Sequence, residues 1–81
     1  MYLEIITPDQ KHFEGEVDSA TFPGSKGEFQ VLNNHAPLVS SLAKGKVRYE
    51  GKSISEEITV TGGVVEILHN KITLLAESIE K

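Results

Sequence analysis

The chain has 81 residues, no cysteine and a formal net charge of −4 at pH 7. This length predicts one domain, residues 1–81, with a thin core, because a chain of this size hides only about 60–65% of its unfolded surface. The missing cysteine excludes disulfides and zinc–thiolate sites, and the acidic balance argues against a nucleic-acid binder. No apolar run approaches the ~20 residues that span a bilayer, and no leader precedes the first strand, so we expect a soluble, intracellular domain.

The first third of the chain predicts extended structure interrupted by turns. Residues 2–7 are β-branched and aromatic, which favours a strand, and Pro8-Asp9 after them favours a turn. Residues 11–22 alternate with a period of two and predict one extended ribbon. Its acidic side chains lie on one face, and Phe13, Val17 and Ser19 lie on the other.

The densest turn chemistry lies between residues 22 and 38. Pro23-Gly24 fits the two central positions of a type II turn, and Gly27 interrupts the chain again. Residues 28–32 predict a short strand, and Asn33-Asn34 predicts a further turn, because asparagine tolerates the left-handed region. We expect this segment to expose side chains near its loop tips, and these are Lys26, Glu28 and His35.

The second half of the chain continues as short strands joined by glycine, asparagine and lysine turns. Its strands are predicted at residues 38–39, 47–49, 54–61, 64–69 and 72–76. No window has the apolar spacing of a long helix, and the best helical candidate, residues 40–44, is too short to matter. Eight to ten short strands with frequent turns predict an all-β fold, a small sandwich or flattened barrel.

Three predicted strands carry apolar residues on both faces, although a two-layer sandwich needs only one apolar face per strand. The extra apolar residues are Ile6 in the first strand, Val64 and Leu68 in the strand at 64–69, and Leu75 in the last. They are consistent with tight burial near strand ends or with scattered surface residues, which are common. They are equally consistent with a docking patch for a partner protein.

No residue pattern in the chain predicts catalysis. The three histidines, His12, His35 and His69, show no metal-ligand spacing, so surface histidines are the simpler interpretation. The chain contains serine, histidine and aspartate residues that could in principle form a catalytic triad, but no segment resembles the nucleophile elbow that such a serine needs. Residues 24–27 lack the spacing and the following helix of a phosphate-binding loop. We therefore expect no catalytic residue, no metal and no cofactor.

Five segments of the chain carry a family resemblance. Residues 22–38 read FPGSKGEFQVLNNHAPL, residues 3–8 read LEIITP, residues 13–17 read FEGEV, residues 62–67 read GGVVEI, and residues 72–77 read ITLLAE. In order and spacing, over all 81 residues, the chain resembles the epsilon subunits of F-type ATP synthases, called delta in mitochondria. The resemblance implies a β-sandwich of about ten strands that belongs to the rotor, packs against the gamma subunit and sits on the c-ring.

The resemblance also implies which residues contact the c-ring. Glu28 matches the family's acidic loop residue, which faces the c-ring loops where an arginine is usual, so a carboxylate–guanidinium contact is expected. Ser25, Lys26 and Gly27 flank that residue and are expected to share the contact.

For the gamma subunit, His35 matches the family histidine near the gamma-facing side. Thr7 and Ser40 match positions on the same side. The family usually has Pro-Gly before this histidine and a glycine at position 30, where this chain has Asn33-Asn34 and Gln30. We expect the turn to survive, because asparagine can adopt a positive φ in place of glycine.

Most family members continue with a helical hairpin that is inhibitory and sometimes binds ATP, whereas this chain stops at Lys81. We therefore expect no helical domain, no ATP site and no autoinhibition. The implied function is a non-catalytic link that couples proton translocation to ATP synthesis on the cytoplasmic face of the bacterial plasma membrane. The alternative is a free-standing β-sandwich that binds a small ligand or carbohydrate, which would need an aromatic-lined site in a chain with five aromatics and no tryptophan.

Overall fold

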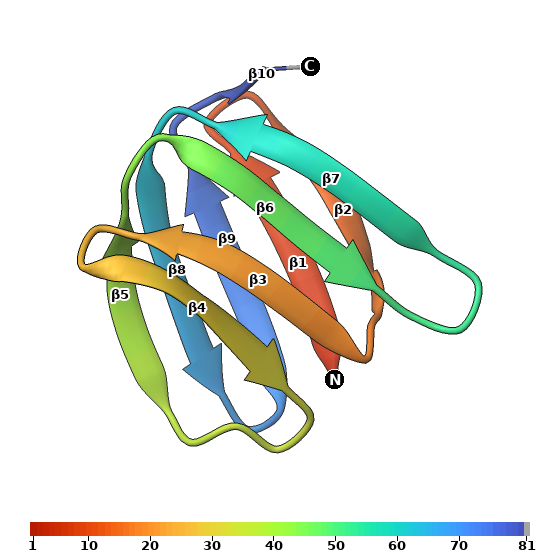
Figure 1. Ribbon diagram of the computed structural model, residues 1–81. Coiled ribbons are helices and arrows are strands. Elements are labelled where there is room, and N and C mark those ends of the chain that lie inside the picture. Colours follow the sequence, from red (N-terminus) through yellow and green to blue (C-terminus); the bar gives the residue numbers. More distant parts are fainter. Residues whose placement is uncertain (81) are drawn as a thin grey trace.

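The computed structural model describes residues 1–80, and this range consists of strands and turns (Figure 1). The all-β prediction is confirmed, and the strand number lies at the upper end of the expected range. The strands are β1 (Tyr2–Thr7), β2 (Gln10–Glu16), β3 (Ser19–Gly24), β4 (Gly27–Leu32), β5 (Leu38–Leu42), β6 (Gly45–Glu50), β7 (Ser55–Val60), β8 (Gly63–Leu68), β9 (Lys71–Ala76) and β10 (Ile79–Glu80).

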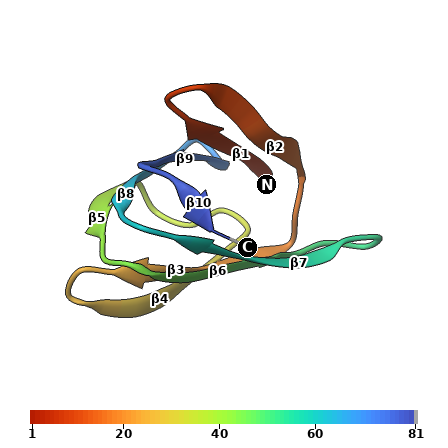
Figure 2. The same cartoon turned by 90° about the horizontal axis from the view of Figure 1, so that it is seen from above.

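The strands form one hydrogen-bonded sheet that folds over on itself into two layers. The pairing order is β10-β7-β6-β3-β5-β8-β9-β1-β2, with β4 on the other side of β3. We call β5, β8, β9, β1 and β2 layer A, and β4, β3, β6, β7 and β10 layer B; Figure 2 shows the two stacked. The layers are joined at β3 and β5 through the single pair Gly24–Leu42. The result is a flattened body of 26 × 26 × 18 Å.

The core lies between the layers and is built from alternate residues of nearly every strand. In β1, Leu3 and Ile5 point inward and are fully buried, as period-two alternation requires. Two aromatic pairs contribute to this packing: Phe22 and Phe29 face each other across the β3–β4 hairpin with ring centroids 5.7 Å apart, and Phe13 of β2 lies 4.7 Å from Tyr49 of β6. Each fully buried large side chain stabilises the fold by about 1.5–3 kcal/mol.

The predicted type II turn at Pro23-Gly24 is wrong. Both residues lie in β3, and the turn falls at residues 25–26, followed by Gly27 with φ 132°. Gly24 is required for a different reason: the opposite strand β4 approaches its backbone too closely for a side chain. A Cβ atom there would lie 2.6 Å from the Gly27 carbonyl oxygen and 2.9 Å from the Phe29 ring. The hairpin therefore closes tightly over the aromatic core.

The predicted ribbon over residues 11–22 is also wrong, because the chain changes layers in its middle. Val17 and Asp18 separate β2 from β3, and the backbone of each is held by a residue distant in sequence. The Val17 N–H donates to Met1 O at 2.9 Å, and the Asp18 N–H donates to Glu50 O at 2.6 Å. Val17 enters the core, whereas Ser19 is not buried. Residues 40–44, the best helical candidate, lie mostly in strand β5.

Candidate interaction surfaces

The outer face of layer A carries most of the exposed large apolar side chains in residues 1–80. Four of them are between 42% and 68% exposed, namely Val39, Val64, Leu68 and Leu75. We call these four, together with the half-buried Ile6, the apolar face.

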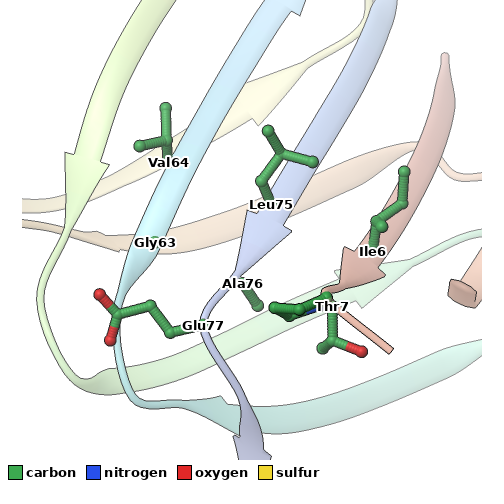
Figure 3. Close-up of a pocket in the computed structure, with 8 residues that line it drawn as sticks. Ile6, Thr7, Gly63, Val64, Leu75, Ala76 and Glu77 are labelled. Carbon is green, nitrogen blue, oxygen red and sulfur yellow. The ribbon is translucent and has the colours of Figure 1, made fainter. Parts of the chain in front are cut away.

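Strand register makes the centre of the apolar face contiguous. Val64 of β8 pairs with Leu75 of β9, and Leu75 pairs with Ile6 of the parallel strand β1. Figure 3 shows the three side chains on adjacent strands. They border a shallow hollow of about 420 Å³ at one end of the layer. Its lining is Ile6, Thr7, Pro8, Gly63, Val64, Leu75, Ala76 and Glu77.

The outer face of layer B is polar by comparison. Its exposed side chains on β6 and β7 include Lys46, Arg48, Glu50 and Glu57. Leu32, on β4, is the large apolar residue exposed on this side, at 54%. Of the interpretations left open by the sequence, burial near strand ends is excluded for Val64, Leu68 and Leu75, which are 42–52% exposed. The clustering on one layer favours a patch over scattered residues.

A charged network covers the β1–β2 end of the outer face of layer A. Lys11 Nζ lies 2.9 Å from a carboxylate oxygen of Glu4 and 3.2 Å from one of Glu14, and Lys71 Nζ lies 3.7 Å from Glu4. The Tyr2 hydroxyl donates to Glu14. The hydrogen bond from Lys11 lowers the pKa of Glu4, and the bonds from Tyr2 and then Lys11 lower the pKa of Glu14. The carboxylates of Glu4 and then Glu14 raise the pKa of Lys11 above its usual range.

Thr7 lies at the end of β1 and lines the hollow of the apolar face. It is 9% exposed, and its hydroxyl is 2.7 Å from Asp9 Oδ1 and 3.1 Å from the Gln10 carbonyl oxygen. The hydroxyl therefore closes the β1–β2 turn and offers little free surface to another protein.

His35 lies at the opposite end of layer A, in the turn after β4. Asn34 adopts a φ of 64°, so the predicted turn at Asn33-Asn34 is confirmed. The Asn34 N–H donates to Asn70 Oδ1 at 2.8 Å, which ties the turn to the β8–β9 hairpin. The His35 ring is half-buried, with Nδ1 2.6 Å from the Ala36 carbonyl oxygen.

Ser40 does not join Thr7 or His35. It is half-buried on β5 and lines a second hollow, of about 590 Å³, between β5 and the β3–β4 hairpin. The same hollow is lined by Ser25, Lys26, Gly27 and Glu28, the four residues predicted to meet the c-ring. The structure thus brings together the expected c-ring set and adds Ser40 to it.

The hairpin tip is held against β5 by backbone and side-chain contacts. The Ser25 N–H donates to the Ser41 carbonyl oxygen at 3.0 Å, and the two hydroxyls hydrogen bond to each other. Lys26 and Glu28 are exposed beside this anchor. Glu28 lies 3.7 Å from Arg48 Nη2, so its carboxylate already has a cation nearby within the chain.

A family model described as the ATP synthase, Delta/Epsilon chain, beta-sandwich domain matches residues 1–81. The chain belongs to this family. An ATP synthase epsilon chain from Chlorobaculum tepidum is 44% identical over 78 residues, which are 95% of this chain and 89% of that protein. One from Nitratidesulfovibrio vulgaris strain DP4 is 42% identical over 81 residues, and one from Pelotomaculum thermopropionicum is 43% identical over 79. This chain spans 60% and 59% of the length of those two relatives.

Two solved structures have the same fold. A chain in the central stalk/c-ring of the Tetrahymena thermophila mitochondrial ATP synthase matches with a TM-score of 0.86 at 15% identity. The match covers 99% of this chain and 65% of that one. A chain in the Euglena gracilis mitochondrial ATP synthase, OSCP/F1/c-ring, matches with a TM-score of 0.89 at 21% identity and covers 96% of this chain and 51% of that one. The β-sandwich is thus the family fold.

Within residues 1–80, no three acidic or histidine side chains gather in a way that could hold a metal ion. The same residues include no helix that could span a membrane.

Sequence reasoning missed Arg48 as a neighbour of Glu28. The two residues lie on β6 and β4, which do not pair with each other; both flank β3, where Thr21 pairs with Gln30 on one side and with Arg48 on the other. The contact therefore depends on two strand registers that no local pattern in the sequence specifies. Val39 was also missed as part of the apolar face. It joins this face because it pairs with Glu66 of β8, and the sequence does not specify that pairing.

Proposed function

We propose that this chain is the β-sandwich part of a central-stalk, or rotor, subunit of an F-type ATP synthase. In this role it ties the gamma subunit to the c-ring, so that proton-driven rotation is passed on without slip, and it catalyses no reaction. Family membership and the relatives named ATP synthase epsilon chain support the proposal. A close-packed sandwich suits a mechanical link, because protein interiors are dense and compress little.

The apolar face is proposed to bind the gamma subunit, and this surface is the observation that carries the proposal. Val39, Val64 and Leu75 remain exposed on a strand surface whose other side already forms the core. Exposed apolar clusters of this kind mark protein-binding sites. Thr7 and His35 lie near the two ends of the face, where they would border the contact.

The hairpin tip of residues 25–28 is proposed to meet the c-ring. The tip projects from layer B and is exposed at Lys26, Gly27 and Glu28. Glu28 would bind a cationic side chain of the ring, in competition with Arg48. The subunit would then lie on the cytoplasmic side of a bacterial plasma membrane, held there through the c-ring.

A matched pair of leucine variants tests the gamma contact. Leu75 and Leu32 are 52% and 54% exposed, but Leu75 belongs to the apolar face and Leu32 to layer B. Burying a whole leucine contributes about 1.5–3 kcal/mol, so burying the exposed half of Leu75 contributes about 1 kcal/mol. Leu75→Ala should weaken binding to purified gamma subunit about fivefold in calorimetry, whereas Leu32→Ala should not.

The proposal fails if wild-type chain and gamma subunit elute separately at micromolar concentration. Equal losses for Leu75→Ala and Leu32→Ala would refute the choice of face. The alternative function, a module that binds small ligands or carbohydrates, gains no support from the hollow of the apolar face, because none of its eight lining residues is aromatic.

A further inference from the structure

Glu66 lies in the middle of the apolar face and is exposed. On its own strand it is flanked, on the same side, by Val64 and Leu68. Across the neighbouring strands it pairs with Val39 of β5 and Thr73 of β9. Any protein that covers the apolar face must therefore also cover this carboxylate.

Glu66 differs from the other carboxylates on the outer face of layer A. Glu4 and Glu14 are paired with Lys11, and Glu16 lies 3.5 Å from the terminal amino group. Within residues 1–80, no cationic group lies within 4.0 Å of Glu66, and no hydrogen bond reaches its carboxylate. The Glu66 carboxylate is therefore exposed to solvent and has no partner among residues 1–80.

Removing that water without replacing it is unfavourable. A carboxylate taken from water into an apolar contact loses its solvation unless a cation and hydrogen bonds replace the water. This loss is comparable with the gain from burying Leu75 and its apolar neighbours. A purely apolar partner would therefore gain little from covering this face.

We propose that the partner docking on the apolar face presents a basic side chain, preferably arginine, to Glu66 from within an otherwise apolar surface. This inference rests on the proposed function, and it specifies the chemistry that the gamma subunit must bring. Arginine fits better than lysine, because its guanidinium is more weakly hydrated, pairs with both carboxylate oxygens and packs against apolar side chains.

The same carboxylate selects against a second copy of this chain. Two apolar faces packed together would bring two Glu66 carboxylates into one contact, while Lys11 and Lys71, the lysines on this side of layer A, are already paired with Glu4; like-charge repulsion and lost solvation therefore oppose the contact. Glu66 therefore keeps isolated chains apart while it accepts a basic partner.

Glu66→Gln tests the proposed contact, with Glu50→Gln as its matched control. Glu50 is also exposed and lies mid-surface, on the outer face of layer B, where its strand partners are Ser19 and Ser55. With purified gamma subunit, Glu66→Gln should weaken binding about tenfold and flatten its dependence on salt, because hydrogen bonds to charged groups are the strong ones. Glu50→Gln should change the affinity less than about twofold.

Comparing Leu75→Asp with Glu66→Gln distinguishes a failure of the basic contact from a failure of the docking proposal. If Leu75→Asp abolishes binding but Glu66→Gln binds as tightly as wild type, or more tightly, the basic contact is overturned and the docking face stands. If Leu75→Asp binds like wild type, both are overturned. As an independent readout, Glu66→Leu should form dimers at concentrations where the wild type sediments as a monomer. A variant that stays monomeric would contradict the selection against self-association.

Discussion

Replacing Gly63 by alanine should unfold a large part of the population, because the first residue of β8 lies too close to β9 for any side chain. Gly63 has a φ of 146°, and a Cβ atom there would lie 2.2 Å from the Leu75 carbonyl oxygen and 3.0 Å from the Ala76 Cα. Both contacts are with backbone, which cannot rotate away. The β8–β9 pair would have to separate at the end that forms the hollow of the apolar face.

Gly27 provides the matched control. It has a similar φ of 132°, but a Cβ atom there would meet nothing within 4 Å. Both alanine variants carry the strain of a left-handed backbone, about 1–3 kcal/mol. Gly63→Ala must also break one or two strand hydrogen bonds, each contributing about 1 kcal/mol, and disturb packing. We expect its total cost to exceed that of Gly27→Ala by roughly 2 kcal/mol or more.

Urea denaturation followed by circular dichroism measures the free energy of unfolding of both variants against wild type. Because a domain of this size has only about 5 kcal/mol or a little more to lose, Gly63→Ala should be partly unfolded in buffer while Gly27→Ala stays folded. Equal costs for the two variants would show that the backbone at Gly63 yields easily. The close approach of β8 and β9 would then not be what fixes this end of layer A.

Three further outcomes follow from the structure. Glu28→Lys should weaken assembly with purified c-ring. It should leave the midpoint of urea unfolding within experimental error, since the Glu28 side chain is 62% exposed. Unchanged assembly with the c-ring would remove Glu28 from the proposed contact. Asn34→Gly should stabilise the fold by about 0.5–1 kcal/mol and Asn34→Ala should destabilise it, because φ is 64° there; a more stable alanine variant would contradict this. The hydrogen bond from Lys11 lowers the pKa of Glu4 below its ordinary value of 4.5. The Lys11–Glu4 contact therefore stabilises the folded state above pH 4.5, and this stabilisation is lost as the pH falls through the lower pKa of folded Glu4. Acid titration of Lys11→Met should show a shallower loss than wild type, and identical curves would exclude the effect.

Some local features of the chain were predicted correctly, because short segments specify them, although the type II turn at Pro23-Gly24 was not among them. Asn33-Asn34 supplies a left-handed residue wherever it lies, and the turn is found at Asn34. β-branched and aromatic segments such as residues 2–7 favour extended backbone regardless of their partners, which accounts for the confirmed all-β class. The family resemblance also rests on local sequence, so it was available before any strand pairing was known.

Strand pairing settled the rest, because contacts between distant strands have no local pattern. Alternation gives a period of two, but it cannot tell which face meets the other layer when both faces are apolar, as in residues 64–69. Val64, Leu75 and Ile6 became one surface only when β8, β9 and β1 aligned in their observed register. For the same reason Val17 could not be recognised as the point where the chain crosses between layers. Close packing between the two layers buries one face of a strand such as β8 and leaves its other face exposed.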